Sequence, residues 1–220
     1  MSAVEAQFAD SVADSVAVSE PVVPPVTDGR ALRSARTRDR IAAAMLELIR
    51  AGNPTPTSEE VALYAGVGHR TVFRRFQDME SLYVEINERV TTLAQPVMAE
   101  PIPDGPVAVR AAALADRRAR IFEQIGVFYR AVEPRLAGSP TLRRLRDDFA
   151  VIQRRQMLAV LPELSADPAR LEAADVIVSM DAWLRLRGVQ GLDVEAAQAA
   201  VVAGLTALVG QGFSGSTAIL

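Results

Sequence analysis

The residues with the clearest chemical potential lie in one short segment, residues 58–76 (SEEVALYAGVGHRTVFRRF) of the 220-residue chain. The segment holds the only histidine, His69, and three arginines, Arg70, Arg74 and Arg75. A histidine can act as a general base or a metal ligand, but both roles need partner residues at defined spacings. The chain has no second histidine and no cysteine. We therefore expect no enzymatic activity, no metal site and no cofactor.

The arginines suit a different chemistry, the recognition of nucleic acid. A guanidinium group binds phosphate, or the major-groove edge of guanine, through two parallel hydrogen bonds. The net charge is −3, but residues 30–90 contain ten arginines against eight acidic residues, so positive charge is concentrated locally. The alternative is a solvated arginine face on an ordinary helical hairpin. The concentration of arginines on one short helix favours contact with DNA.

A glycine-containing turn in the same segment predicts a helix-turn-helix. This motif needs a small residue where its helices cross, a turn residue that tolerates positive φ, and apolar anchors beneath the second helix. Ala62, Gly66 and Val72 meet these needs in that order, and Phe76 is a further anchor. Residues 57–60 (TSEE) have the spacing of a capping box, which opens the first of the two helices.

Hydrophobic periodicity predicts an all-α chain. Apolar residues recur every three or four positions along most of the sequence, and no alternating β-branched runs separate the turn signals. The first helix is expected to begin near Arg36 and to end at Gly52. A fourth helix, after the helix-turn-helix, is expected from about Glu80 to a stop before Pro96.

Three regions follow from this pattern. Residues 1–30 are acidic and end near a proline cluster, so we predict a disordered tail. Residues 31–95 are predicted to form the helix-turn-helix DNA-binding domain, whose fourth helix links it to the rest. Residues 96–220 are predicted to form a helical effector-binding and dimerisation domain, in which a single helix covers residues 168–183.

Residues 196–209 (AAQAAVVAGLTALV) carry no charge, which predicts a helix covered on more than one side. One side can pack on its own domain, and the other can meet a second copy of the chain through small residues. The alternative is a central core helix in a monomer. The residues assigned to the dimer interface are Ala197, Ala200, Val201, Gly204, Leu205 and Leu208.

Residues 36–90 resemble the DNA-binding module of the TetR/AcrR family of transcriptional regulators. The resemblance rests on AGVGHRTVFRRF at residues 65–76 and QDMESL at residues 77–82, which match the family's turn, recognition helix and charged turn. Gly68 stands where the family usually has serine, and Phe73 stands where tyrosine is common. The resemblance implies an all-α fold in which a linking helix joins the helix-turn-helix module to a helical ligand-binding and dimerisation domain.

The resemblance also implies a function. A homodimer would bind a palindromic operator in double-stranded DNA as a repressor, and an unidentified small-molecule effector would release it. The alternative is a helical interaction module that has lost DNA binding. The residues assigned to DNA contact are His69, Arg70, Thr71, Phe73, Arg74, Arg75 and Thr57, with Arg36 and Arg38 ahead of the first helix.

Large apolar residues on the middle helices are candidates for lining an effector cavity, although we favour plain core for each. They are Phe122, Phe128, Met157, Met180 and Trp183. Asp181 is the one acidic residue in an apolar stretch (VIVSMDAWL). It could bond a ligand, but we favour an ion pair with Arg185, four residues further along the helix.

The sequence also predicts where in the cell the protein is located. The N-terminus lacks the basic region and the continuous apolar stretch of a signal peptide. No apolar run approaches the length of a membrane span, so we expect a cytoplasmic protein without a membrane partner.

Overall fold

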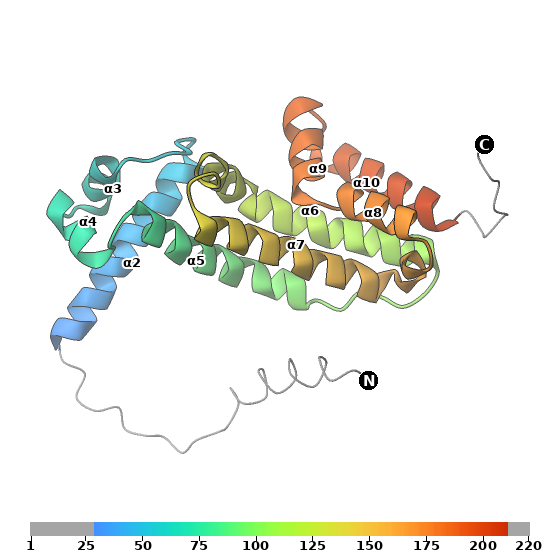
Figure 1. The fold of residues 1–220 in the computed structure, drawn as a ribbon, viewed down its shortest axis with the longest axis horizontal. Helices are drawn as coiled ribbons and strands as arrows, with labels where there is room; N and C mark the ends of the chain where they lie inside the picture. The colour runs from blue at the N-terminus through green and yellow to red at the C-terminus, as the bar shows by residue number, and fades with distance from the viewer. Residues whose placement is uncertain (1–28, 211–220) are drawn as a thin grey trace, which may run out of the picture. The chain divides into compact units, whose positions relative to one another are not determined.

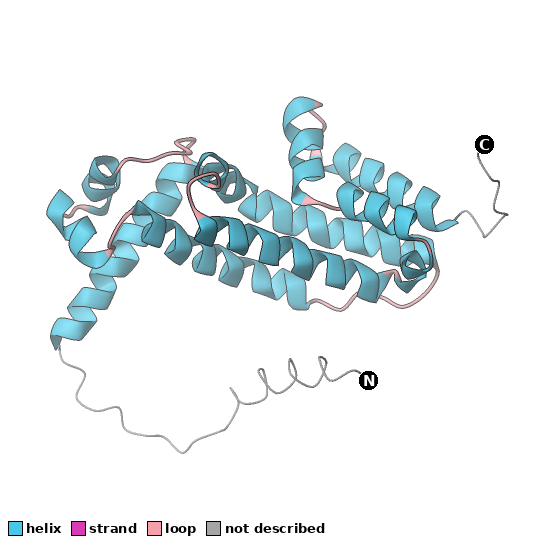
Figure 2. Ribbon diagram, viewed as in Figure 1, coloured by secondary structure: helices cyan, strands magenta, loops and turns pink. Residues whose placement is uncertain are grey.

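The computed structural model describes residues 29–210, and every regular element in this range is helical (Figure 2). The predicted all-α class is therefore confirmed. The chain divides into two units after Thr37. The described part of the first unit is a helical segment from Gly29 to Thr37, and the second unit begins at Arg38 and holds the other helices.

The helices have the following bounds, with the labels of Figure 1. The α-helices are α2 (Gly29–Arg50), α3 (Ser58–Ala65), α4 (His69–Arg75), α5 (Met79–Ala99), α6 (Val107–Val132), α7 (Pro140–Val160), α8 (Pro168–Ile177), α9 (Met180–Leu184) and α10 (Val194–Gly210). Short helical segments are η1 (Glu133–Arg135), η2 (Pro162–Ala166) and the π-helical η3 (Arg185–Val189). None of the described helices is both long enough and apolar enough to cross a membrane.

Local sequence signals explain where α3 and α4 begin and end. The predicted capping box is present: the Thr57 side chain accepts from the Glu60 amide, and the Glu60 carboxylate accepts from the Thr57 amide. Gly66 ends α3 with φ of 62°, the left-handed conformation that glycine adopts at little cost. Gly68 then occupies the N-cap of α4 without a side-chain cap, as expected for a glycine in place of serine.

Within the second unit, α6 is the central helix (Figure 1). Helices α5 and α7 run along one side of it, and α10 packs on another side with α8 beside it. Because α6 is covered from several directions, apolar residues along its length are buried, including Leu114, Phe122 and Phe128. Arg154 on α7 forms an ion pair with Asp175 on α8 at 2.9 Å, which ties these helices together.

Two predicted helix boundaries are wrong. Helix α2 begins at Gly29 rather than near Arg36, so Gly29 and Arg30 are helical and do not belong to the predicted tail. The remainder of that tail, residues 1–28, lies outside the described residues. Helix α5 continues past Pro96 to Ala99. A proline this close to the end removes only one helical hydrogen bond, and packing of α5 on α6 holds the last turn.

The single helix predicted for residues 168–183 is two helices. The break occurs at Val178 and Ser179, and in Figure 1 α9 points in a different direction from α8. The Ser179 hydroxyl caps the new helix by accepting from the Ala182 amide at 3.1 Å, and it donates to the Val176 carbonyl. The new direction buries Trp183, whose indole N–H donates to Glu123 on α6 at 2.9 Å.

Candidate functional site

Helix α4 is held by its apolar side. Val72 and Phe76 are 1% and 2% exposed, and they pack into the same core as Ala62 and Ala65 of α3. The three requirements of a helix-turn-helix identified in the sequence are therefore met together by this short segment. With its inner face occupied, α4 has a fixed outward face.

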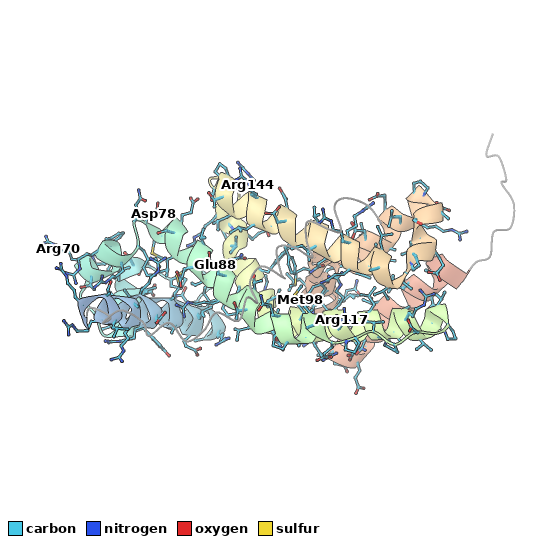
Figure 3. All side chains as sticks on the ribbon, turned by 90° about the horizontal axis from the view of Figure 1, so that it is seen from below. Arg70, Asp78, Glu88, Met98, Arg117 and Arg144 are labelled. Atoms are coloured by element: carbon cyan, nitrogen blue, oxygen red, sulfur yellow. The ribbon has the colours of Figure 1, made fainter. Side chains whose placement is uncertain are left out.

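The outward face of α4 carries positive charge. Arg70, Arg74 and Phe73 are exposed, and Arg70 projects from the surface in Figure 3. Thr71 and Arg75 are half-buried at the edges of this face. Exposed guanidinium groups on an anchored helix can reach phosphates and base edges, which is the chemistry expected of a recognition helix.

His69 is engaged with the neighbouring helix. Its Nε2 lies 2.8 Å from the Ser58 hydroxyl and 3.2 Å from a carboxylate oxygen of Glu59, and its ring stands edge-on to Phe73. These contacts link the start of α4 to the start of α3. Among the described residues no three histidine, cysteine or acidic side chains gather as metal ligands.

Thr57 and Arg38, both predicted to contact DNA, have their polar groups directed within the protein. The Thr57 hydroxyl donates to the Glu60 carboxylate at 3.0 Å. The Arg38 guanidinium pairs with Glu85 at 2.8 Å, donates to the Arg75 carbonyl at 3.0 Å, and lies 4.4 Å from the centre of the Phe76 ring. Both side chains thus brace the helix-turn-helix in this structure. Arg36 is exposed in the part of α2 that precedes Arg38.

Arg38 belongs to a charge network that fastens the end of α4 to α5; we name it the α5 clamp, formed by Arg38, Glu85, Arg89 and Asp39. Arg89 pairs with Glu85 at 2.9 Å and with Asp39 at 2.6 Å. Burial is the largest influence on the pKa of Glu85 and by itself raises it, but hydrogen bonds and charges from Arg38 and Arg89 lower that pKa below its usual value.

Another arginine that braces the helix-turn-helix, Arg40, was missed in the sequence. Its guanidinium donates to the Ala65 carbonyl at 2.5 Å and to the Gly66 carbonyl at 3.2 Å, which satisfies carbonyls at the end of α3. The spacing between Arg40 and the turn, about 25 residues, carries no periodic signal. Only the crossing of α2 over the turn brings these groups together.

We expect Gly66→Ala to disturb the turn without unfolding the helices around α6. The φ of 62° is unfavourable for a residue with a Cβ, at a cost of about 1–2 kcal/mol. A Cβ at this position would also lie 3.1 Å from the Arg40 guanidinium. Urea unfolding and DNA binding of the variant would test this. Gly52→Ala is a control for positive φ alone, because no atom lies within 4 Å of a Cβ there. Equal loss of DNA affinity in both variants would contradict a specific role for the Gly66 turn.

The lowered pKa of Glu85 predicts a pH-dependent contribution to stability. A carboxylate with a folded-state pKa below its unfolded value stabilises the fold above the unfolded pKa, about 4.3, and loses this contribution as pH falls through the folded pKa. Wild type should therefore exceed Glu85→Gln in unfolding free energy at neutral pH, and the difference should shrink below about pH 4. Urea unfolding across this range measures it. Glu88→Gln, at an exposed position on the same helix (Figure 3), should change stability little; a pH-independent gap for Glu85→Gln would refute the prediction.

A cavity of about 240 Å³ lies between α5, α6 and α7. Its wall is largely apolar, and Ile49 of α2 also reaches it. The lining residues include Tyr83, Ala94, Phe128, Arg146, Asp148 and Ile152. Met98, visible near the end of α5 in Figure 3, closes part of the wall. An apolar cavity with few polar groups is the usual form of a small-molecule site.

Of the residues predicted to line an effector cavity, the structure places Phe128 in this wall. Phe122, Met157, Met180 and Trp183 are instead buried in the core, each 2% exposed or less, and do not line the cavity. Hydrophobic periodicity identified them as inward-facing, but it does not distinguish a filled interior from a hollow one. Tyr83 and Ile86 on α5 line the cavity and were missed for the same reason.

The favoured ion pair between Asp181 and Arg185 is wrong. Asp181 pairs with Arg146 on α7 at 2.9 Å and accepts from the Tyr129 hydroxyl on α6 at 3.1 Å. The guanidinium of Arg146 also stacks over the Tyr129 ring at 4.3 Å and pairs with Glu133. Burial and the nearby Asp181 charge raise the pKa of Tyr129 to about 12. The break before α9 redirects Asp181, so spacing along a continuous helix does not apply.

The residues predicted for the dimer interface divide between two faces of α10. Ala197, Val201 and Leu205 are buried within the chain's own core, and Gly204 approaches Ile177 of α8 so closely that a Cβ would lie 3.1 Å away. These four residues are therefore covered by other parts of the same chain. Ala200 remains exposed and Leu208 half-exposed.

Comparisons with known proteins identify solved structures with a similar fold. No protein-family model and no curated protein matches the sequence. A TetR-family transcriptional regulator from Streptomyces coelicolor superimposes with a TM-score of 0.61 at 24% identity, covering 80% of this chain and 82% of that one. A protein assigned to the same family, from Mesorhizobium loti MAFF303099, has a TM-score of 0.58 at 18% identity, covering 81% of this chain and 97% of that one. The chain therefore has the fold of TetR-family transcriptional regulators, as the sequence resemblance predicted.

Proposed function

We propose that this protein is a sequence-specific, DNA-binding transcriptional regulator. The observation that carries the proposal is the anchored α4, which presents Arg70 and Arg74 while Val72 and Phe76 are buried beneath it. Helix α4 would enter the major groove, with these arginines on base edges or phosphates. Thr71, Arg75 and Phe73 border the same face and would contact the DNA backbone.

A two-fold dimer would present a second copy of α4 to the DNA. The outer faces of α8 and α10 keep small or apolar residues uncovered, with Val176 67% exposed and Ala200, Ala203 and Ala207 aligned along α10. Pairing these faces between two copies would form an isologous helical interface. Two copies of α4 would then meet a palindromic site, with half-sites spaced by the dimer geometry.

The cavity between α5, α6 and α7 would hold a small-molecule effector, and the protein would act as a repressor that the effector releases. Helix α5 is the physical connection, because one side of it lines the cavity and its Glu85 belongs to the α5 clamp. A ligand that displaces α5 would shift Arg38 and, through the Arg75 carbonyl, the end of α4. The effector would favour a dimer in which the spacing between the two copies of α4 no longer fits the operator.

Selection from random double-stranded DNA, performed near physiological salt with the full-length protein, tests the proposal. Low salt would reward non-specific contacts between arginine and phosphate. We expect enrichment of a palindromic consensus, which would establish sequence preference and two-fold assembly together. No enrichment, together with weak salt dependence of any residual DNA binding, would favour a helical interaction module without DNA-reading function.

A further inference from the structure

One residue in the wall of the cavity between α5, α6 and α7 carries an unsatisfied polar group. Tyr83 is 1% exposed and contributes to the cavity wall, and its hydroxyl has no hydrogen-bond partner among residues 29–210. The Arg135 guanidinium lies over the face of the ring, 4.2 Å from its centre. A buried polar group without a partner is unfavourable, so its presence in a cavity wall points to a missing partner.

The charges around the cavity constrain what that partner can be. The wall contains two charged side chains, Arg146 and Asp148, of opposite sign. Arg146 is already paired with Glu133 and Asp181. An anionic ligand would therefore find no uncommitted positive charge in the wall, and its burial would be unfavourable without one.

The size of the cavity constrains the ligand further. At about 240 Å³ it exceeds the roughly 150 Å³ of a cavity that holds benzene. A molecule of two or three rings fits this range better than a single-ring compound. Apart from the charged pair and the polar Asn87 and Thr91, the wall is aliphatic and aromatic, with Phe128 and Ile152 among its residues.

We infer that the cavity binds a non-anionic, largely apolar ring compound that forms one hydrogen bond with the Tyr83 hydroxyl. The inference rests on the proposed function for the role of this ligand as effector, but the binding itself does not depend on DNA. Tyr83 would act as the polar anchor that orients the ligand, while the apolar wall supplies most of the affinity. Because Tyr83 and Glu85 are two residues apart on α5, the anchored group and the α5 clamp would contact the same helix from different sides.

Two fluorescent probes of nearly the same skeleton show whether a negative charge on the ligand weakens binding when its apolar surface is kept. N-phenyl-1-naphthylamine is uncharged and has one N–H that can donate to a tyrosine oxygen, whereas 8-anilinonaphthalene-1-sulfonate adds a sulfonate. Fluorescence titration of the full-length protein should show saturable binding of the uncharged probe. The sulfonate should bind at least about tenfold more weakly, since Arg146, the cation of the wall, is already paired with two carboxylates. Tighter binding of the sulfonate, or no binding of the uncharged probe, would overturn the inference.

Substitutions locate the binding. Tyr83→Phe should weaken the uncharged probe by about three- to tenfold, the contribution of one hydrogen bond. Tyr64→Phe is the matched control, because Tyr64 is 58% exposed on α3 and should leave the affinity unchanged. Ala94→Phe should fill the cavity and abolish binding, and Ile152→Trp at the more exposed rim serves if that variant does not fold. Unchanged affinity in Tyr83→Phe would overturn the anchoring role.

Thermal unfolding distinguishes an anchor from a structural hydroxyl. If the hydroxyl lacks a partner in the free protein, Tyr83→Phe should have an equal or higher Tm without probe. A lower Tm with unchanged probe affinity would show that the hydroxyl is satisfied internally and would overturn the inference. The same preparations, tested on the selected DNA, keep the two proposals separate: DNA binding without probe binding overturns only the ligand assignment, and the reverse result overturns only the proposed function.

Discussion

Phe122→Ala is expected to lower the free energy of unfolding by about 3–5 kcal/mol, the largest effect predicted for this protein. Phe122 is 2% exposed on the central helix α6, with its ring centre 6.3 Å from that of Trp183 on α9. Truncation would remove buried apolar surface and leave a void that the surrounding helices cannot fill completely. It would also remove the aromatic contact that fastens α9 to α6.

Urea unfolding at a fixed protein concentration measures this loss, since self-association would make stability depend on concentration. Phe73→Ala is the matched control, because the Phe73 side chain is 44% exposed and its removal should change stability by no more than about 0.5 kcal/mol. A loss below about 1 kcal/mol for Phe122→Ala would mean that this residue lines open space rather than packed core.

Arg74→Ala is expected to weaken binding to the selected DNA by about 1–3 kcal/mol and to relax sequence preference at one position of each half-site. Arg74 is exposed on α4, where Val72 and Phe76 hold the helix from beneath. Loss of a bidentate contact with a base would affect one base pair, whereas loss of a phosphate contact would weaken all sequences alike. Repeating the selection with the variant distinguishes these two contributions.

Arg144→Ala provides the charge-matched control. Arg144 is exposed on α7, an element outside the helix-turn-helix (Figure 3), and its replacement changes the net charge by the same amount. Its DNA affinity should stay close to wild type at physiological salt, because screening limits the influence of distant surface charge. Equal weakening in both variants would indicate a general charge effect and would refute a reading role for Arg74.

The α5 clamp gives the proposed regulation a physical route that can be tested apart from DNA recognition. Glu85 contacts Arg38 and Arg89, while Ile86 and Asn87, the next residues on α5, line the cavity. A ligand and the clamp therefore act on one helix from different sides. In the proposed regulation, Arg38 would influence DNA binding through the end of α4 without touching DNA.

Short-range sequence signals were enough to predict the local features of the helix-turn-helix segment. The capping box of Thr57 and Glu60, the positive φ of Gly66 and the inward placement of Val72 and Phe76 all appeared as predicted. Each depends on residues within one or two helical turns, where backbone geometry determines which side chains meet. The all-α class followed from the same short-range periodicity.

Which helix surfaces contact each other depends on tertiary packing and could not be predicted from the sequence. The pairs Arg38 with Glu85 and Arg146 with Asp181 join residues 47 and 35 positions apart, at spacings that no helical period encodes. Periodicity placed Ala197 on a covered face of its helix, but it did not show that the rest of the same chain covers that face. Nor can it separate a packed interior from a cavity, because both are lined by the same apolar residues. That difference depends on how closely α5, α6 and α7 approach one another, which is a property of their packing and not of any one helix.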